Sequence, residues 1–99
     1  MLIITKKNDG AELKMLLSGR LDTVTAPELE QELKESLDEV TDLVLDMEDL
    51  EYISSAGLRV LLSAQKKMTK QGSMKLVHVN TTILEIFEVT GFTDILTIE

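Results

Sequence analysis

Residues 42–62 have the sequence DLVLDMEDLEYISSAGLRVLL, which decides the fold because it joins an apolar strand to an amphipathic helix. The first part, Asp42–Asp46, is a nearly continuous apolar run, and this predicts a short strand with both sheet faces covered. The polar segment from Asp46 to Ser55 is expected to form a loop. A helix then runs from Ser55 to about Lys70 and ends at Gly72, because glycine is a common C-terminal cap.

The sequence before this unit predicts a β-hairpin followed by a helix. Strands Leu2–Thr5 and Leu13–Ser18 flank the turn signal Asn8-Asp9-Gly10, so the two strands are expected to be antiparallel. The helix begins at Thr25, which lies three residues before Glu28 in a capping-box spacing with a proline between them. Leucines at positions 29, 33 and 37 predict a single buried stripe on this helix.

The sequence after this unit predicts one more strand and one more helix. The strand is Met74–Val79. The helix is Thr82–Thr90, whose first residue stands at capping-box spacing from Glu85, and Gly91 lies just past its end. Ile95–Ile98 is expected to form a short terminal strand or helix.

The element order β-β-α-β-α-β-α-β predicts one α/β domain over residues 1–99. Its sheet is expected to be mixed and mostly parallel, with crossover helices and an N-terminal antiparallel hairpin. A length of 99 residues with 43% apolar content suits one modest core. The chain has no Cys and no apolar run near the ~18 residues of a membrane span, and Met1–Thr5 is not expected to be a signal peptide because polar residues follow it too soon. We therefore expect a soluble, cytoplasmic protein that does not associate with membranes.

Charge is distributed unevenly along the chain, whose net charge is −8. Residues 1–50 contain thirteen acidic and five basic side chains, whereas residues 51–99 contain five of each. Nucleic-acid binding needs clustered Lys or Arg, so this balance argues against a nucleic-acid partner. The acidic half is either a surface for a basic protein partner or a solvated face that maintains solubility, and the sequence favours neither.

Two polar segments are expected to meet at one edge of the sheet. Asp22-Thr23-Val24-Thr25 follows the second strand, and the segment that ends at Ser55 follows the third. The carboxyl ends of neighbouring parallel strands lie at the same edge, where α/β proteins commonly place their sites. Ser55 at a helix start is either a simple N-cap or a place for a phosphate, since backbone N–H groups and the helix dipole favour negative charge there.

No residue pattern in the sequence indicates an enzyme active site. Ser55 has neither a suitably placed histidine base nor a Gly-x-Ser-x-Gly elbow, and the chain has no glycine-rich phosphate loop. His78 is expected in a core strand as a packed or hydrogen-bonded residue, because no second ligand stands at metal-binding spacing. We therefore predict a protein that is not an enzyme and has no metal or cofactor.

Three segments resemble the bacterial anti-sigma factor antagonists of the STAS superfamily: Gly19–Ala26, Leu43–Leu50 and Ser54–Leu58. The segment Ile86–Leu96 is also similar to the C-terminal helix of that family and its exit. The resemblance covers essentially the whole chain, and its motifs stand at the separation that the family has. It implies a single STAS-like domain.

The resemblance also implies a partner-switching phosphoprotein. In the family, the unmodified antagonist binds an anti-sigma factor that is also a serine kinase with a histidine-kinase-like ATP fold, and this binding releases the sigma factor. Phosphorylation of the antagonist breaks the complex, and a serine phosphatase resets it. The family's acceptor serine corresponds to Ser55, and the implied partner-binding residues are Asp22, Thr23, Thr25, Ser54, Ser55, Ala56, Gly57 and Leu58.

The phosphoacceptor segment departs from the family pattern at three positions. The family's Asp falls on Ser54, its second hydroxyl residue on Ala56 and a frequent later Gly on Arg59. The Ser54 hydroxyl is therefore a rival phosphate acceptor. Ala56, in contrast, has no hydroxyl, so the position after Ser55 offers no rival acceptor. Arg59 either helps to hold a phosphate on Ser55 or is an ordinary exposed helix residue. The alternative function is a STAS regulatory or scaffolding module that is not phosphorylated and has nucleotide or a transporter-linked partner as its ligand.

Overall fold

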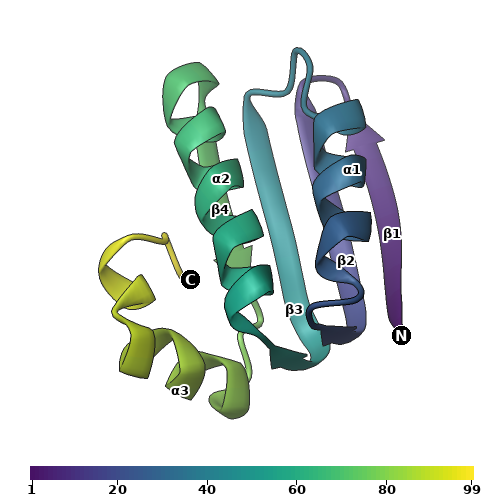
Figure 1. Ribbon diagram of the computed structural model, residues 1–99. Helices are drawn as coiled ribbons and strands as arrows, with labels where there is room; N and C mark the ends of the chain where they lie inside the picture. Colours follow the sequence, from purple (N-terminus) through teal and green to yellow (C-terminus); the bar gives the residue numbers. More distant parts are fainter.

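A four-stranded sheet forms the centre of the computed structural model, which describes all residues from Met1 to Glu99 (Figure 1). The strands are β1 (Leu2–Asp9), β2 (Glu12–Leu21), β3 (Asp42–Ile53) and β4 (Ser73–Val77), and their spatial order is β1-β2-β3-β4. β1 is antiparallel to β2, whereas β2, β3 and β4 are parallel to one another. The predicted α/β class, with a mostly parallel sheet and an N-terminal hairpin, is confirmed.

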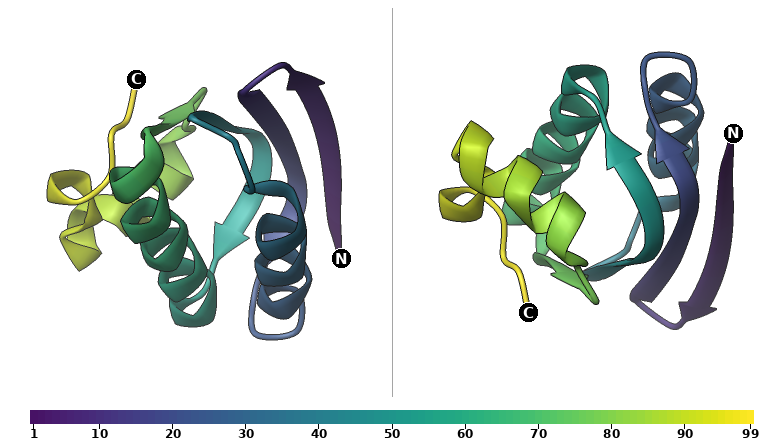
Figure 2. Two further views of the ribbon diagram at one scale, coloured as in Figure 1. Left: turned by 90° about the horizontal axis from the view of Figure 1, so that it is seen from above. Right: turned by 90° about the horizontal axis from the view of Figure 1, so that it is seen from below.

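Three α-helices connect and follow the strands: α1 (Ala26–Ser36), α2 (Ser55–Gln71) and α3 (Thr81–Thr90). α1 and α2 lie side by side on the same face of the sheet, and α3 lies near the ends of β3 and β4 (Figures 1 and 2). The chain ends with a short 3-10 helix, Phe92–Asp94, and one parallel bridge between Leu76 and Ile98. None of the helices combines the length and the apolar composition needed to cross a membrane.

One apolar core lies between the sheet and the helices. Side chains alternate along β3, so Leu43, Leu45 and Met47 join this core together with the buried faces of all three helices. Val44 and Asp46 belong to the opposite face of the sheet, which neither α1 nor α2 covers. Both residues are nevertheless buried, as is the whole run from Leu43 to Met47, so the prediction that both faces of this short strand are covered is confirmed.

The first three strands are longer than the sequence indicated. β1 continues to Asp9, so the hairpin loop is Gly10-Ala11 and not Asn8-Asp9-Gly10, and Gly10 takes the positive φ of 63° that the loop requires. β3 continues to Ile53 and stays paired with β2, so the prediction of a loop from Asp46 to Ser55 is wrong. The pairing tolerates polar residues because the side chains of Glu48, Asp49 and Glu51 are exposed.

The region between β4 and α3 also differs from the sequence prediction. β4 ends at Val77 because His78 has a φ of 55°, which is outside the strand region. His78 therefore lies outside the predicted core strand and is exposed, although its Nδ1 forms the expected hydrogen bond, at 3.0 Å from Oδ2 of Asp46.

Asn80 caps α3 in place of the predicted capping box at Thr82. Its Oδ1 accepts a hydrogen bond from the Ile83 N–H at 3.0 Å, while its Nδ2 donates to the Leu50 carbonyl at 2.8 Å. The helix therefore begins at Thr81. The predicted glycine caps at the C-terminal ends of α2 and α3 are confirmed: Gly72 caps α2, and Gly91, in the left-handed conformation, caps α3.

We expect Asp46→Asn to destabilise the fold in a pH-dependent way. Burial acts to raise the pKa of Asp46, but hydrogen bonds from the Glu48 N–H and His78, with the charge of Lys14, hold this pKa below its usual 3.8. The resulting stabilisation is present above about pH 4 and is lost as the pH falls through the lowered pKa of the folded state.

Denaturant titrations at several pH values test this expectation. Near pH 7 the variant should lose about 1–3 kcal/mol of unfolding free energy, and its stability should fall less steeply than that of the native chain below about pH 4. The exposed Asp38 offers a matched control. An equal loss in Asp38→Asn, or parallel pH profiles, would contradict the role of Asp46.

Candidate functional site

The parallel pairing of β2 with β3 brings two segments to the same edge of the sheet. Leu21 pairs with Ile53, and the Ser54 N–H donates to the Leu21 carbonyl at 2.8 Å. Asp22 and Ser54 therefore begin neighbouring turns. The structure thus brings the segments of Asp22 and Ser55 together at one edge, as the strand order requires.

Gly57 allows α2 to begin directly against this pair of strand ends. A Cβ at position 57 would lie 2.7 Å from Cγ of Leu21 and 3.1 Å from Cγ2 of Ile53, closer than ordinary van der Waals contact. Gly57 is buried, and so is the next residue, Leu58. The absence of a side chain therefore fixes how closely the first turn of α2 approaches the sheet.

The loop from Asp22 to Thr25 is held by its own polar groups. Oδ1 of Asp22 accepts hydrogen bonds from the N–H groups of Val24 and Thr25, both at 3.0 Å. The Thr25 hydroxyl accepts from the Asp22 N–H at 2.8 Å and donates to the Arg20 carbonyl at 2.7 Å. Because Thr25 makes no side-chain cap bond to α1, the predicted capping box with Glu28 is wrong.

The hydrogen bonds to Asp22 also favour the ionised form of its carboxyl group. They hold the pKa of Asp22 below its usual 3.8, chiefly through the Thr25 N–H. The other oxygen of the carboxylate, Oδ2, lies 3.8 Å from Nε of Arg20, and the guanidinium of Arg20 lies 4.6 Å from the ring centroid of Tyr52. The edge of the sheet therefore presents a fixed carboxylate beside the start of α2.

Ser54 and Ser55 have different environments. Ser54 is the N-cap of α2, and its Oγ accepts a hydrogen bond from the Gly57 N–H at 3.3 Å. Ser55 is the first residue of the helix and is exposed, and its hydroxyl forms no hydrogen bond within the chain. The capping role that the sequence left open for Ser55 therefore belongs to Ser54.

The eight residues predicted to bind a partner divide by exposure. Thr23 and Ser55 are exposed, and Asp22, Ser54 and Ala56 are partly exposed. The remaining three, Thr25, Gly57 and Leu58, are buried. The buried three can position the other five but do not present side chains to a partner.

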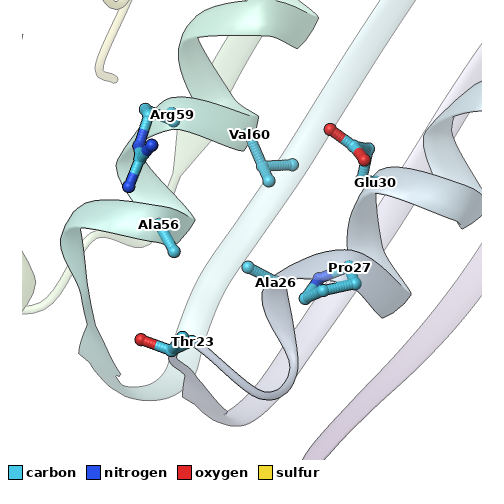
Figure 3. A pocket seen from close by; sticks show the side chains of 7 residues that line it. All are labelled: Thr23, Ala26, Pro27, Glu30, Ala56, Arg59 and Val60. Carbon is cyan, nitrogen blue, oxygen red and sulfur yellow. The ribbon is translucent and has the colours of Figure 1, made fainter.

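A groove lies between α1 and α2 and includes Ala56, the residue that follows Ser55 in the chain (Figure 3). It has a volume of about 270 Å³ and is lined by Thr23, Ala26, Pro27, Glu30, Ala56, Arg59 and Val60. Only Thr23 and Ala56 belong to the predicted set, because the contribution of α1 depends on helix packing and has no local sequence signal. The sequence also gave no role to Val24, whose apolar side chain is 79% exposed beside the groove residue Thr23.

The site has a free hydroxyl but no partner group for covalent catalysis. The one histidine of the chain, His78, bonds to Asp46 and does not contact Ser55. The structure contains no group of three or more His, Asp or Glu side chains that could hold a metal ion. What the arrangement offers is an accessible serine at a helix N-terminus, where a negative group is stabilised by the backbone N–H groups.

Comparisons with known proteins agree with this arrangement. The family model named STAS domain matches residues 3–99. The anti-sigma-B factor antagonist of Bacillus subtilis (strain 168) is 31% identical over 94 residues, which cover 94% of this chain and 85% of that protein. The similarity therefore extends over nearly the whole of both chains.

Solved structures of antagonists have the same fold. The crystal structure of an anti-sigma factor antagonist from Mycobacterium paratuberculosis has a TM-score of 0.88 at 24% identity and covers 99% of this chain and 85% of its own. SpoIIAA in its unphosphorylated form has a TM-score of 0.75 at 16% identity and covers 100% and 87%. The Bacillus cell fate determinant SpoIIAA in the phosphorylated form has the same TM-score and identity and covers 98% and 91%.

We expect Thr25→Val to raise the pKa of Asp22 toward 3.8 without restoring it fully. The substitution removes the hydroxyl that bonds within the loop, whereas the N–H of residue 25 still donates to the carboxylate. Titration of the Asp22 carboxyl group by NMR measures the effect. Thr23→Val is the matched control, because the exposed Thr23 hydroxyl makes no hydrogen bond. The interpretation fails if both variants shift the pKa equally.

Proposed function

The chain belongs to the STAS domain family, and we propose that it is an anti-sigma factor antagonist whose binding is switched off by phosphorylation of Ser55. The unmodified chain binds an anti-sigma factor that is also a serine kinase, and thereby frees a sigma factor in the bacterial cytoplasm. Transfer of a phosphoryl group to Ser55 ends the complex, and a serine phosphatase restores the free hydroxyl. The family is regulatory and not enzymatic.

The observation that carries the proposal is the state of the Ser55 hydroxyl. It is exposed, makes no hydrogen bond and stands on the first turn of a 17-residue helix. A kinase can therefore reach it without unfolding the helix. The N–H groups and dipole of α2 then stabilise the phosphate, because the first turn contains no acidic residue that already occupies this position.

The two neighbouring serines differ in a way that favours Ser55 as the acceptor. The Ser54 hydroxyl already accepts a hydrogen bond from Gly57 and is only partly exposed. Modification of Ser54 would remove the N-cap, whereas modification of Ser55 leaves it in place. The SpoIIAA structure solved in a phosphorylated form, which has the same fold, supports a phosphoprotein role.

Phosphorylation is expected to weaken partner binding by electrostatics and desolvation. A phosphate adds a charge of about −1.5 to −2 at neutral pH. Ser55 lies at the same edge as the ionised Asp22. A partner packed over this edge would have to bury a dianion beside a carboxylate, and a cost of only about 1.4 kcal/mol reduces affinity tenfold.

We expect Ser55→Ala to bind the anti-sigma factor constitutively and Ser55→Asp to bind at least about tenfold more weakly. Isothermal titration calorimetry with the purified anti-sigma factor of the same bacterium measures both affinities. Thr5→Asp, at an exposed β1 position away from this edge and from the groove, controls for added negative charge. If both Ser55 variants bind with the affinity of the native chain, the phosphoswitch proposal is wrong.

Phosphoryl transfer is expected to modify Ser55 and not Ser54. Incubation with ATP and the anti-sigma kinase, followed by mass spectrometry, locates the phosphate. Ser54→Ala should still accept it, at a stability cost of about 1 kcal/mol for the lost cap, whereas Ser55→Ala should not. Nucleotide binding without transfer would instead support the non-phosphorylated regulatory or scaffolding module.

A further inference from the structure

The groove that includes Ala56 continues along the two helices. A second cavity of about 230 Å³ shares Glu30 and Val60 with the first and extends it to Leu33, Ala64 and Lys67. We refer to the two together as the α1–α2 groove. From Ala56 to Lys67 the groove follows about 16 Å of α2, given a rise of 1.5 Å per residue, and this length accommodates about three turns of another helix.

Small side chains form the floor of this groove. Ala26 of α1 and Ala56 of α2 point toward the space between the helices, together with Val60 (Figure 3). Ala64 continues the same row one turn further along α2. Small floor residues permit the close approach on which helix packing depends, because ridges of one helix must enter grooves of its neighbours.

The rim of the groove is locally positive, although the chain carries a net charge of −8. On the α1 side, Glu30 and Lys34 lie 4.0 Å apart and largely offset each other. On the α2 side, Arg59 and Lys67 are exposed, and neither has a carboxylate within 4.0 Å. A bound segment would therefore meet two unpaired cations along the edge that α2 forms.

We propose that the α1–α2 groove binds an amphipathic helix of the anti-sigma factor that directs small apolar side chains to the floor and carboxylates to Arg59 and Lys67. This corresponds to the helix-in-groove mode of recognition. The identity of the partner rests on the proposed function, whereas the chemistry of the bound segment rests on the shape and charge of the groove. The groove also begins at Thr23, at the same edge as Ser55.

Arg59 connects the groove to the phosphoacceptor. It follows Ser55 by four residues, so the two side chains lie on the same side of α2. Its guanidinium extends toward the first turn of the helix (Figure 3). A phosphate on Ser55 pairs with this guanidinium, and the cation is then no longer available to the partner's carboxylate. Phosphate and partner thus compete for Arg59.

Charge reversal on α2 tests the occupant of the groove. Arg59→Glu and Lys67→Glu should each weaken binding of the purified anti-sigma factor by about fivefold or more at low salt, and the loss should shrink as salt is added. Lys66→Glu makes the same change at an exposed α2 lysine outside the groove and should alter affinity by less than about twofold. Equal losses in the three variants would overturn the proposal.

Thiol protection gives a readout that does not depend on affinity. The chain has no Cys, so Ser63→Cys at the groove and Thr5→Cys on exposed β1 each carry a single reactive site. With saturating anti-sigma factor, maleimide should react at least about tenfold more slowly with the cysteine at position 63 and at an unchanged rate with that at position 5. If binding occurs and position 63 stays reactive, the groove proposal fails while the antagonist function stands. If no binding occurs, the proposed function fails and the groove proposal fails with it.

A double-mutant cycle tests the competition for Arg59. The affinity lost through Ser55→Asp should be at least about threefold smaller in an Arg59→Gln background than in the native chain, because the cation that aspartate would sequester is already absent. Circular dichroism of each variant verifies that α2 is intact. An undiminished effect of Ser55→Asp in that background would rule out the competition.

Discussion

The site depends on the close contact of Gly57 with the paired ends of β2 and β3. Any side chain there would collide with Leu21 and Ile53, so only glycine lets the first turn of α2 lie against the sheet. This contact fixes the position and the rotation of the helix. Ser55 consequently faces solvent, while Ala56 faces α1. A packing constraint in the core thus determines which side chains the surface presents.

The two serines at the start of α2 have separate roles: Ser54 caps the helix, whereas the exposed Ser55 is available for modification. Serine and aspartate are both strong N-caps, because the side-chain oxygen of either accepts a backbone N–H. Ser54 therefore performs the structural role of the aspartate that the family resemblance puts at this position, but without its charge. Neither the N-cap nor the first turn of α2 contains an acidic residue, so the positive end of the helix dipole favours a negative group on Ser55.

The sequence predicted the features that local signals encode and missed those that depend on distant contacts. The hairpin and the glycine ends of α2 and α3 follow from turn and cap residues within a few positions. The second half of β3 looked like a loop because its pairing with β2 is non-local. Asn80 displaced the capping box at Thr82 because it also bonds to the Leu50 carbonyl, thirty residues earlier in the chain. The meeting of Asp22 with Ser55 followed from strand order, whereas the α1–α2 groove required knowledge of helix packing.

Net charge and local charge act over different distances in this molecule. The overall charge of −8 affects the approach of a partner, but at physiological salt it is screened beyond about 8 Å. Contacts in the groove are shorter than this distance, so the sign at Arg59 and Lys67 determines which segment can bind there. A phosphate on Ser55 changes the net charge only to about −10, a modest change for the whole chain. At one end of the groove, however, the same phosphate would pair with the Arg59 guanidinium. The accessible positive charge of Arg59 would then become an ion pair whose net charge is negative. The position of the phosphate, and not the total charge that it adds, is therefore what can make release specific.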